Sequence, residues 1–427
     1  MKRKWFYILF ILSALSSCLE SPVMTTGIVN GKEKPTVLTV QEDPFSDGGG
    51  NLVFQGEITS KGKAEIIKKG FYWSTVSNNP GDKDNIIILS DTSAGIFSGE
   101  LKGASGENTY YWRAFAQNSF GCDSGEVQSC HTPAIWMAKT DFPPDKRWRG
   151  AVFMLNNRIY MTCGITDVGL NMPVDLWEYN IASDQWNQTL IMSFIGAARV
   201  YPSVFTIGNI AYVGMGLQSY TVAPFKDLYQ FSADFRKWGQ ITIPDNFDER
   251  YKAVAFSLNG NGYIIGGLSS NDAELNDVWQ YNPNGDVWEQ KNNFPVNLYG
   301  GISIYDNNRA FAGFGENSES TRTLWEYDQA ADKWNEFAKL PDEETTAISS
   351  GVIVKNTIYV VDGKYSIWAL NMSDTTWTKK SDLPSDFLQE TGGVGGQTLL
   401  TTDSSDSIYV GLGLCNLLYV YHPLWDN

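Results

Sequence analysis

An aromatic residue followed four positions later by glycine recurs through the C-terminal part of this 427-residue chain. Neighbouring copies start 48 to 52 residues apart, and the six pairs are Tyr160/Gly164, Tyr212/Gly216, Tyr263/Gly267, Phe311/Gly315, Tyr359/Gly363 and Tyr409/Gly413. A second mark, an aromatic residue with tryptophan nine positions later, occurs as Trp177/Trp186, Tyr229/Trp238, Trp279/Trp288, Trp325/Trp334 and Trp368/Trp377. A regular period of this length indicates one structural unit repeated along the chain.

Each unit holds short segments in which apolar and polar residues alternate. In the third unit these segments are AVAFSL, GYIIGG, DVWQYN and VWEQK. Asn259-Gly260 and Pro283-Asn284-Gly285 separate two pairs of them, and such sequences favour turns. Four short strands in a unit of this length are typical of one blade of a β-propeller. The repeated tryptophans then provide flat apolar surfaces for packing between blades.

These marks resemble the Kelch repeat. Gly266-Gly267 in the third unit matches the double glycine of that family, and the other units keep one glycine there. An arginine stands thirteen residues before the aromatic residue in the first three units, at Arg147, Arg199 and Arg250. The resemblance covers about residues 134–427 and implies an all-β, Kelch-type propeller.

The sixth unit lacks a fourth strand of its own. Residues 408–413 (IYVGLG) and 417–423 (LLYVYHP) supply its second and third strands, and the chain ends shortly afterwards. The segment IWMAKTDFP, from Ile135, compares well with KWNEFAKLP and TWTKKSDLP in the fourth and fifth units. We therefore predict six blades, the last one closed by the N-terminal strand 135–140, which leaves no open sheet between the first and last blades.

Residues 22–133 have a different pattern, with predicted strands in NLVFQGEI, GFYWS, NIIILS and GIFSGEL. The stretch ENTYYWRAFAQNSFG (107–121) resembles the penultimate strand of fibronectin type III domains, with Tyr110 in place of the corner tyrosine. That family usually has leucine six residues earlier, where this chain has Ala104. The resemblance implies a fibronectin III-like or other immunoglobulin-like β-sandwich, which most often acts as a spacer.

The chain begins MKRKWFYILFILSALSSC, a short basic segment followed by an apolar run that is too short to span a bilayer comfortably. Leu15-Ser16-Ser17-Cys18 resembles the lipobox of bacterial lipoproteins, and the alternative is an ordinary signal peptide with a nearby cysteine. The resemblance implies a signal peptide over residues 1–17, a lipid on Cys18 and a place in the bacterial cell envelope. We expect the outer membrane, with the side of the membrane left open.

The formal net charge of −16 argues against nucleic acid and anionic lipid headgroups as partners. The remaining cysteines, Cys122, Cys130, Cys163 and Cys415, match no zinc-ligand spacing. Buried free thiols are expected, and a Cys163–Cys415 disulfide between neighbouring first and last blades is the open alternative.

Histidine is scarce, because the chain has only His131 and His422. Some Kelch propellers are related to galactose oxidase, whose copper needs a pair of histidines that this chain cannot place at the channel mouth. The chain has no phosphate loop, dinucleotide fingerprint or EF-hand loop either. We therefore expect no cofactor and no bound metal.

Ligands of propellers usually bind at one mouth of the central channel, where the loops that precede the innermost strands converge. The candidate ligand-binding residues in these loops are Arg147, Trp148, Arg149, Arg199, Tyr201, Glu249, Arg250, Tyr251, Tyr299 and Glu390. Arginine pairs with carboxylates through its planar fork, and tyrosine and tryptophan stack on sugars. The three repeated arginines are equally well explained as supports between blades, so the unrepeated Arg149 is the better ligand candidate.

The expected function is a non-enzymatic, lipid-anchored binding module for a glycan, a sugar acid or a protein. The alternative is an enzyme, because six-bladed Kelch propellers include the N-acetylneuraminate epimerases, which interconvert sugar anomers. In that case Glu249, Glu344 or Glu390 would carry protons, and Arg149 would hold the sugar carboxylate. A third reading is a simple protein scaffold. The sequence leaves the ligand and the oligomeric state open.

Overall fold

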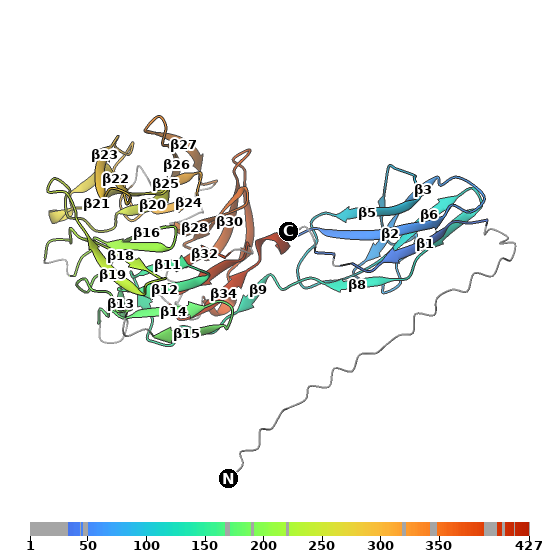
Figure 1. Cartoon of the computed structure of the whole chain (residues 1–427), viewed down its shortest axis with the longest axis horizontal. Helices are drawn as coiled ribbons and strands as arrows, with labels where there is room; N and C mark the ends of the chain where they lie inside the picture. The colour runs from blue at the N-terminus through green and yellow to red at the C-terminus, as the bar shows by residue number, and fades with distance from the viewer. Residues whose placement is uncertain are drawn as a thin grey trace, which may run out of the picture. The chain divides into compact units, whose positions relative to one another are not determined.

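A computed structural model describes residues 33–42, 44–45, 50–166, 171–188, 192–218, 222–317, 322–341, 348–387, 399–403, 406–413 and 415–426. The fold is all-β, as the sequence predicts (Figure 1). Within these residues no helix has the length and apolar character needed to cross a membrane. The described chain forms two compact units: the first holds residues 33–42, 54–99 and 112–128, and the second holds 44–45, 50–53, 100–111 and the described chain from Ser129.

The N-terminal strands form two antiparallel sheets. One has the order β1 (Thr36–Val40), β2 (Leu52–Ser60), β5 (Gly95–Leu101). The other has the order β4 (Asn85–Ile88), β3 (Lys68–Ser74), β6 (Thr109–Asn118), β7 (Gly121–Ser124), with β8 (Gln128–His131) also paired to β6. Alternate residues of β2 are buried, which is the pattern of a strand with one face on a core. Phe54 of β2 stacks on Trp112 of β6 with ring centroids 4.6 Å apart.

In its described residues, the second unit contains six antiparallel four-stranded sheets. From first to fourth strand they are β11 (Ala151–Leu155), β12 (Arg158–Thr162), β14 (Leu176–Asn180), β15 (Gln185–Gln188); β16 (Ser203–Ile207), β17 (Ile210–Gly214), β18 (Leu228–Ser232), β19 (Lys237–Ile241); β20 (Val254–Leu258), β21 (Asn261–Leu268), β22 (Glu274–Asn282), β23 (Val287–Lys291); β24 (Ile302–Tyr305), β25 (Ala310–Gly313), β26 (Thr323–Asp328), β27 (Lys333–Lys339); β28 (Ile348–Val354), β29 (Thr357–Asp362), β30 (Ser366–Asn371), β31 (Trp377–Asp382); and β32 (Leu399–Thr402), β33 (Ile408–Gly411), β34 (Leu418–Tyr421), β9 (Trp136–Ala138). We number these sheets first to sixth in this order.

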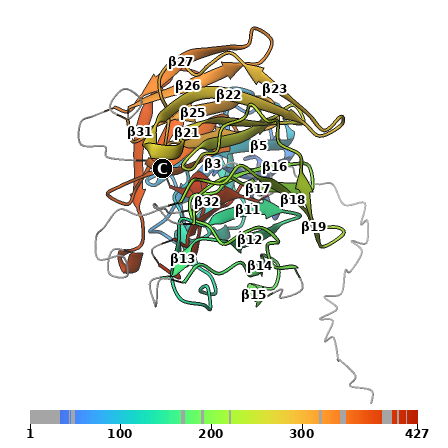
Figure 2. The same cartoon turned by 90° about the vertical axis from the view of Figure 1, so that its left-hand side faces the viewer.

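The first strands of the sheets form a closed ring, so the unit is a β-propeller. Each of β11, β16, β20, β24, β28 and β32 contacts the next, and β32 contacts β11. Figure 2 shows the strands of the first sheet following one another in the order β11, β12, β14, β15. The repeat of four strands per period is therefore present in space as well as in sequence.

The repeated glycine connects each of the first three sheets to the next one. The N–H of Gly164 donates to the carbonyl of Arg199 at 2.8 Å, and the N–H of Gly216 donates to that of Arg250 at 2.9 Å. In the third sheet both Gly266 and Gly267 have positive φ, 54° and 98°. A Cβ atom on Gly266 would also lie 2.2 Å from the Leu298 carbonyl oxygen, so this turn requires glycine at a position where the first two sheets have Cys163 and Met215.

The repeated tryptophans connect a sheet to the segment at the end of the fourth strand of the preceding sheet. The indole N–H of Trp186 donates to the carbonyl of Thr140 at 2.9 Å, and that of Trp288 donates to Thr242 at 2.8 Å. Trp238 and Trp377 make the same type of bond, to Met192 at 2.8 Å and Lys339 at 2.9 Å. These side chains therefore join neighbouring sheets by both apolar packing and a directed hydrogen bond.

The sixth sheet is assembled from the two ends of the unit. β9 pairs antiparallel with β34, with Trp136 opposite Tyr421, and their ring centroids lie 4.6 Å apart. Asp426 follows this sheet and accepts hydrogen bonds from the Tyr421 hydroxyl at 2.6 Å and from the Ser381 N–H and hydroxyl at 2.8 and 2.9 Å. The C-terminal residues thus fasten the sixth sheet to the fifth.

We predict that Asp426→Asn lowers the free energy of unfolding by about 2–3 kcal/mol, because three donors lose a charged acceptor in a buried place. The measurement is urea unfolding followed by tryptophan fluorescence. Glu289→Gln, at an exposed site on β23, is the control and should change stability by less than about 0.5 kcal/mol. Equal effects of the two substitutions would argue against a fastening role for Asp426.

All four described cysteines are free thiols. Cys163 and Cys415 are buried in separate apolar clusters, so the structure has no disulfide between them. Burial raises the pKa of the Cys163 thiol to about 12. Cys122 and Cys130 are half-buried.

We predict that iodoacetamide at pH 8 leaves Cys163 and Cys415 unmodified in the native protein, since only an accessible thiolate reacts. All four thiols should react after denaturation without a reducing agent, as measured by peptide mass spectrometry. If Cys163 and Cys415 resist alkylation even after denaturation, the two are joined by a disulfide and the free-thiol assignment is wrong.

Candidate functional site

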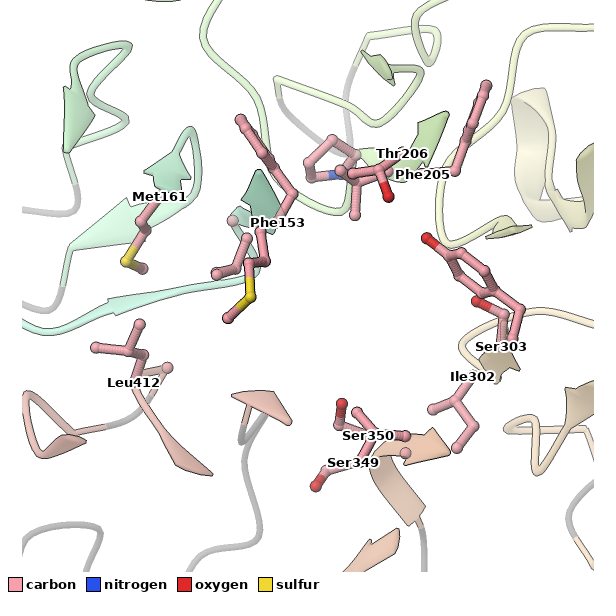
Figure 3. Close-up of a pocket in the computed structure, with 18 of the residues that line it drawn as sticks. Phe153, Met161, Phe205, Thr206, Ile302, Ser303, Ser349, Ser350 and Leu412 are labelled. Carbon is pink, nitrogen blue, oxygen red and sulfur yellow. The ribbon is translucent and has the colours of Figure 1, made fainter. Parts of the chain in front are cut away.

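The central channel of the propeller contains a cavity of about 520 Å³. Residues of the first strands β11, β16, β24, β28 and β32 line it, and Arg149, Gly150 and Gly413 lie where the channel opens. Figure 3 shows Thr206, Ser303, Ser349 and Ser350 around this space. Hydroxyl groups are thus plentiful in the lining, whereas the described lining residues include no aspartate, glutamate or histidine.

Tyr305 and Thr206 connect two parts of the channel wall that are separated by the third sheet. The Tyr305 hydroxyl is hydrogen-bonded to the side chain and backbone of Thr206, which links β24 of the fourth sheet to β16 of the second. Burial raises the pKa of Tyr305 above its ordinary value. Both residues stand near the C-terminal ends of their strands, whereas Arg149 precedes its strand. This bond therefore lies at the end of the channel away from Arg149.

The three repeated arginines lie in buried ion pairs. Arg199 is fully buried, and its two terminal nitrogens contact Asp227 at 2.5 and 2.8 Å. Arg250 is also fully buried and contacts Asp277 at 2.7 and 2.8 Å. Arg147, 2% exposed, binds Asp175 at 2.8 and 3.2 Å. The sequence left a structural support and a ligand contact equally open for these arginines, and their occupied guanidinium groups favour the structural support.

The aspartate partners of these arginines also have a signal in the sequence, which was not recognised as a predicted site. Aspartate stands two residues before the first aromatic residue of the second mark in the first three units, and those are the units with the arginine. The Trp177 indole also donates to Asp175 at 2.8 Å. Burial opposes the charge of Asp175, but hydrogen bonds from Arg147 and Trp177 outweigh it and keep the pKa of Asp175 below its ordinary value. The fourth and fifth units have Thr323 and Ser366 at the aspartate position.

The position two residues after the arginine, or after Leu298 in the fourth unit, defines a row of four residues at the channel mouth. We call Arg149, Tyr201, Lys252 and Gly300, from the first to the fourth sheet, the mouth row. All four have left-handed backbones, with φ of 57°, 53°, 54° and 62°. The Tyr201 N–H donates to the Arg149 carbonyl at 2.8 Å, and the Gly300 N–H donates to that of Lys252 at 2.9 Å. For a residue with a side chain this conformation costs about 1–2 kcal/mol, and such strain is common at functional sites.

Cations and aromatic rings alternate along the mouth row. The guanidinium carbon of Arg149 lies 4.7 Å from the Tyr201 ring centroid and 5.3 Å from that of Trp148. The Lys252 Nζ lies 5.1 Å from the Tyr201 centroid and 6.0 Å from that of Tyr299. These distances fall within the range of cation–π attraction. The sequence named Trp148, Arg149, Tyr201 and Tyr299 as candidates but not Lys252, whose signal was its position two residues after Arg250.

The two cations of the row differ in their partners. Lys252 Nζ pairs with a Glu316 oxygen at 2.6 Å. Arg149 forms no ion pair with any residue that the structure describes. Arg149 is therefore a positive charge at the channel mouth that no described acidic side chain neutralises. Arg149 also lines the cavity.

The other predicted site residues lie outside the row or outside the described chain. Tyr251 is 5% exposed, and its hydroxyl donates to Asp272 at 2.5 Å, so it anchors a loop. The Ser270 hydroxyl binds Glu249 at 2.6 Å, and this bond is the main reason why the pKa of Glu249 is below its ordinary value. Glu344 and Glu390 lie outside the described residues. Within the described part of the chain, no group of three or more histidine, cysteine or acidic side chains could hold a metal ion.

We predict that Arg250→Met lowers the free energy of unfolding by about 3–5 kcal/mol, because Asp277 is left charged without a partner. Arg149→Met, the matched control, should cost less than about 1 kcal/mol, since it breaks no ion pair with a described residue. Guanidinium unfolding of the two variants measures the difference. Similar losses for both would contradict separate scaffold and ligand roles.

Comparison with known proteins places this architecture in a family. The model of the KLHDC2/KLHL20/DRC7 Kelch-repeats domain matches residues 149–363. Kelch-like protein 23 of Homo sapiens is 26% identical over 234 residues, which cover 54% of this chain and 39% of that protein. Kelch-like protein 23 of Pongo abelii is 26% identical over 179 residues, covering 42% and 31%. The chain thus spans well under half the length of these relatives.

A solved structure of YjhT matches with a TM-score of 0.52 and 13% identity, covering 66% of this chain and 95% of that one. At this identity the likeness concerns the fold alone. Because the Kelch-repeats model matches half of the chain, and its range includes the mouth row and the repeated glycines up to Gly363, the chain belongs to the Kelch-repeat family.

Proposed function

We propose that the protein is a binding module that holds an acidic segment of a protein partner at the mouth of its propeller, with Arg149 as the anchor. The observation that carries this proposal is the state of Arg149, which has no carboxylate partner among the described residues although the whole chain is strongly acidic. A guanidinium group pairs with a carboxylate through two parallel hydrogen bonds. A protein partner fits the Kelch-repeat family, whose propellers typically bind other proteins.

The Arg149 side chain is also ordered before a ligand binds. Its left-handed backbone fixes the direction of the side chain, and Trp148 and Tyr201 flank the guanidinium group. A side chain ordered before binding loses less conformational entropy when the ligand arrives. The flanking rings also provide flat apolar surface for the partner, as is common at the centre of protein interfaces.

Binding is better supported than catalysis. Anomer exchange of a sugar acid needs a proton donor and acceptor near the anomeric carbon. The described channel lining has neither a carboxylate nor an imidazole, and Glu249 is engaged by Ser270. Glu344 and Glu390, the other proton carriers suggested by the sequence, lie outside the described residues. The hydroxyl-rich channel makes an acidic glycan the second ligand class to test.

The proposal extends to the architecture around the site. We interpret the six sheets as six blades and the two N-terminal sheets as a fibronectin III-like spacer. The two-sheet pairing supports the spacer, as does the Tyr110 hydroxyl, which accepts a hydrogen bond from the Ser105 N–H at 2.8 Å, in the manner of a corner tyrosine. With a lipid on Cys18, the spacer would carry the propeller at the outer membrane of a bacterial envelope.

We predict that Arg149→Gly weakens ligand binding at least tenfold while the free energy of unfolding changes by less than about 1 kcal/mol. Glycine adopts a positive φ without strain, which offsets the lost stacking, whereas the carboxylate contact is lost. The measurement is the binding of the purified protein to an array of acidic peptides and acidic glycans, read together with thermal unfolding.

Arg236→Gly is the matched control, because Arg236 also has a left-handed backbone, with φ of 51°, but lies in the hairpin between β18 and β19. It should leave array binding unchanged. Retention of binding by Arg149→Gly would overturn the site assignment. Hits confined to glycans would replace the protein partner with a glycan, and a blank array for the wild type would refute an acidic ligand.

A further inference from the structure

The fourth position of the mouth row carries no side chain of its own, and another residue fills its place. A Cβ atom on Gly300 would lie 2.4 Å from Glu316 Oε1, so the Glu316 carboxyl group covers this glycine closely. The Glu316 N–H donates to the Tyr299 carbonyl at 2.9 Å, which holds the backbone of Glu316 against the row. Where the first three sheets present Arg149, Tyr201 and Lys252, the fourth sheet therefore presents a carboxylate.

The Glu316 carboxylate forms an ion pair with Lys252, a cation of the mouth row. Glu316 Oε2 lies 2.6 Å from Lys252 Nζ, and the side chains of Lys252 and Glu316 are 15% and 50% exposed. The other nearby acid, Glu274, is engaged by Asn297 at 3.2 Å and by Asn317 at 2.6 Å. Glu316 is thus the described acidic group that neutralises Lys252, and the anionic end of this pair faces solvent.

We propose that Glu316 competes with the ligand: it occupies Lys252 in the free protein and is displaced when an acidic group binds beside Arg149 and Lys252. This inference rests on the proposed function and adds a specificity determinant to the same site. The Arg149 guanidinium carbon and the Lys252 Nζ lie 4.7 and 5.1 Å from the Tyr201 ring centroid, so the two cations are no more than about 10 Å apart. A ligand with two acidic groups at a matching spacing can engage both cations, whereas a ligand with one group engages Arg149 and leaves the Glu316–Lys252 pair intact.

The energetics allow such an exchange. An ion pair with a half-exposed partner shifts an equilibrium by no more than about fivefold. Acidic groups of a ligand can therefore displace Glu316 from Lys252. The Glu316–Lys252 pair still lowers the affinity of the protein for weakly charged ligands. Because Gly300 has no side chain, the displaced Glu316 leaves open space over the backbone for the ligand.

The test measures the affinity of a dye-labelled tetraglutamate peptide by fluorescence anisotropy at low ionic strength. Glu316→Gln should bind the peptide about three- to fivefold more tightly than the wild type. Glu336→Gln is the matched control, since Glu336 is 49% exposed, lies in the same sheet and pairs with Lys339 at 3.1 Å. It should change the affinity by less than twofold. In the double variant Glu316→Gln/Lys252→Gln the gain should disappear, because the cation that Glu316 neutralises is gone.

Two results separate this inference from the proposed function. Equal affinities of Glu316→Gln and Glu336→Gln, with binding still weakened by Arg149→Gly, overturn the competitor role and leave the Arg149 site in place. A lower melting temperature of Glu316→Gln with unchanged affinity assigns the pair to stability alone and also overturns the inference. Absence of peptide binding in every variant overturns both proposals for acidic peptides.

Discussion

The buried arginine–aspartate pair is the interaction on which the mouth of this propeller depends. Arg199 binds Asp227 at the start of the third strand of its sheet and the Met215 carbonyl at the end of the second, at 2.9 Å. Its own carbonyl accepts the N–H of Gly164 from the preceding sheet. One residue thus fixes strands of two sheets, and the chain reaches the mouth row only two residues later. The position of the row follows from this anchoring.

Strain and rigidity occur together around the same opening. Arg149, Tyr201 and Lys252 adopt left-handed backbones although each carries a large side chain. The residue before the repeated glycine is left-handed as well, at Cys163 and Met215. Such conformations persist only where neighbouring contacts enforce them. The inter-sheet hydrogen bonds and the buried ion pairs provide that enforcement, so the site is built on rigid elements and does not rely on ordering by the ligand.

The sequence was sufficient for the periodic part of the structure. The spacing of Tyr263, Gly267, Trp279 and Trp288 predicted strands that the third sheet contains, because alternation and turn residues are local signals. These local signals do not predict which way the side chains at the channel mouth point. Periodicity says nothing about a residue with positive φ, so Lys252 was missed. It also left Arg250 open between a structural support and a ligand contact, whereas the structure buries this arginine against Asp277. Contacts between distant segments, such as Glu316 with Lys252, have no signature in a single sequence.

The way the ring is closed has a mechanical consequence. β8 ends at His131 and β9 begins at Trp136, so the strand that completes the sixth sheet is also the strand through which the chain enters the propeller. Tension along the chain at Ile135 therefore acts on the pairing of β9 with β34. Asp426 holds the C-terminal side of that seam to Ser381 of the fifth sheet. The two ends of the propeller unit are thus joined by a pairing of only three residues on each strand, which makes this short seam the place where pulling on the chain would first separate the ring.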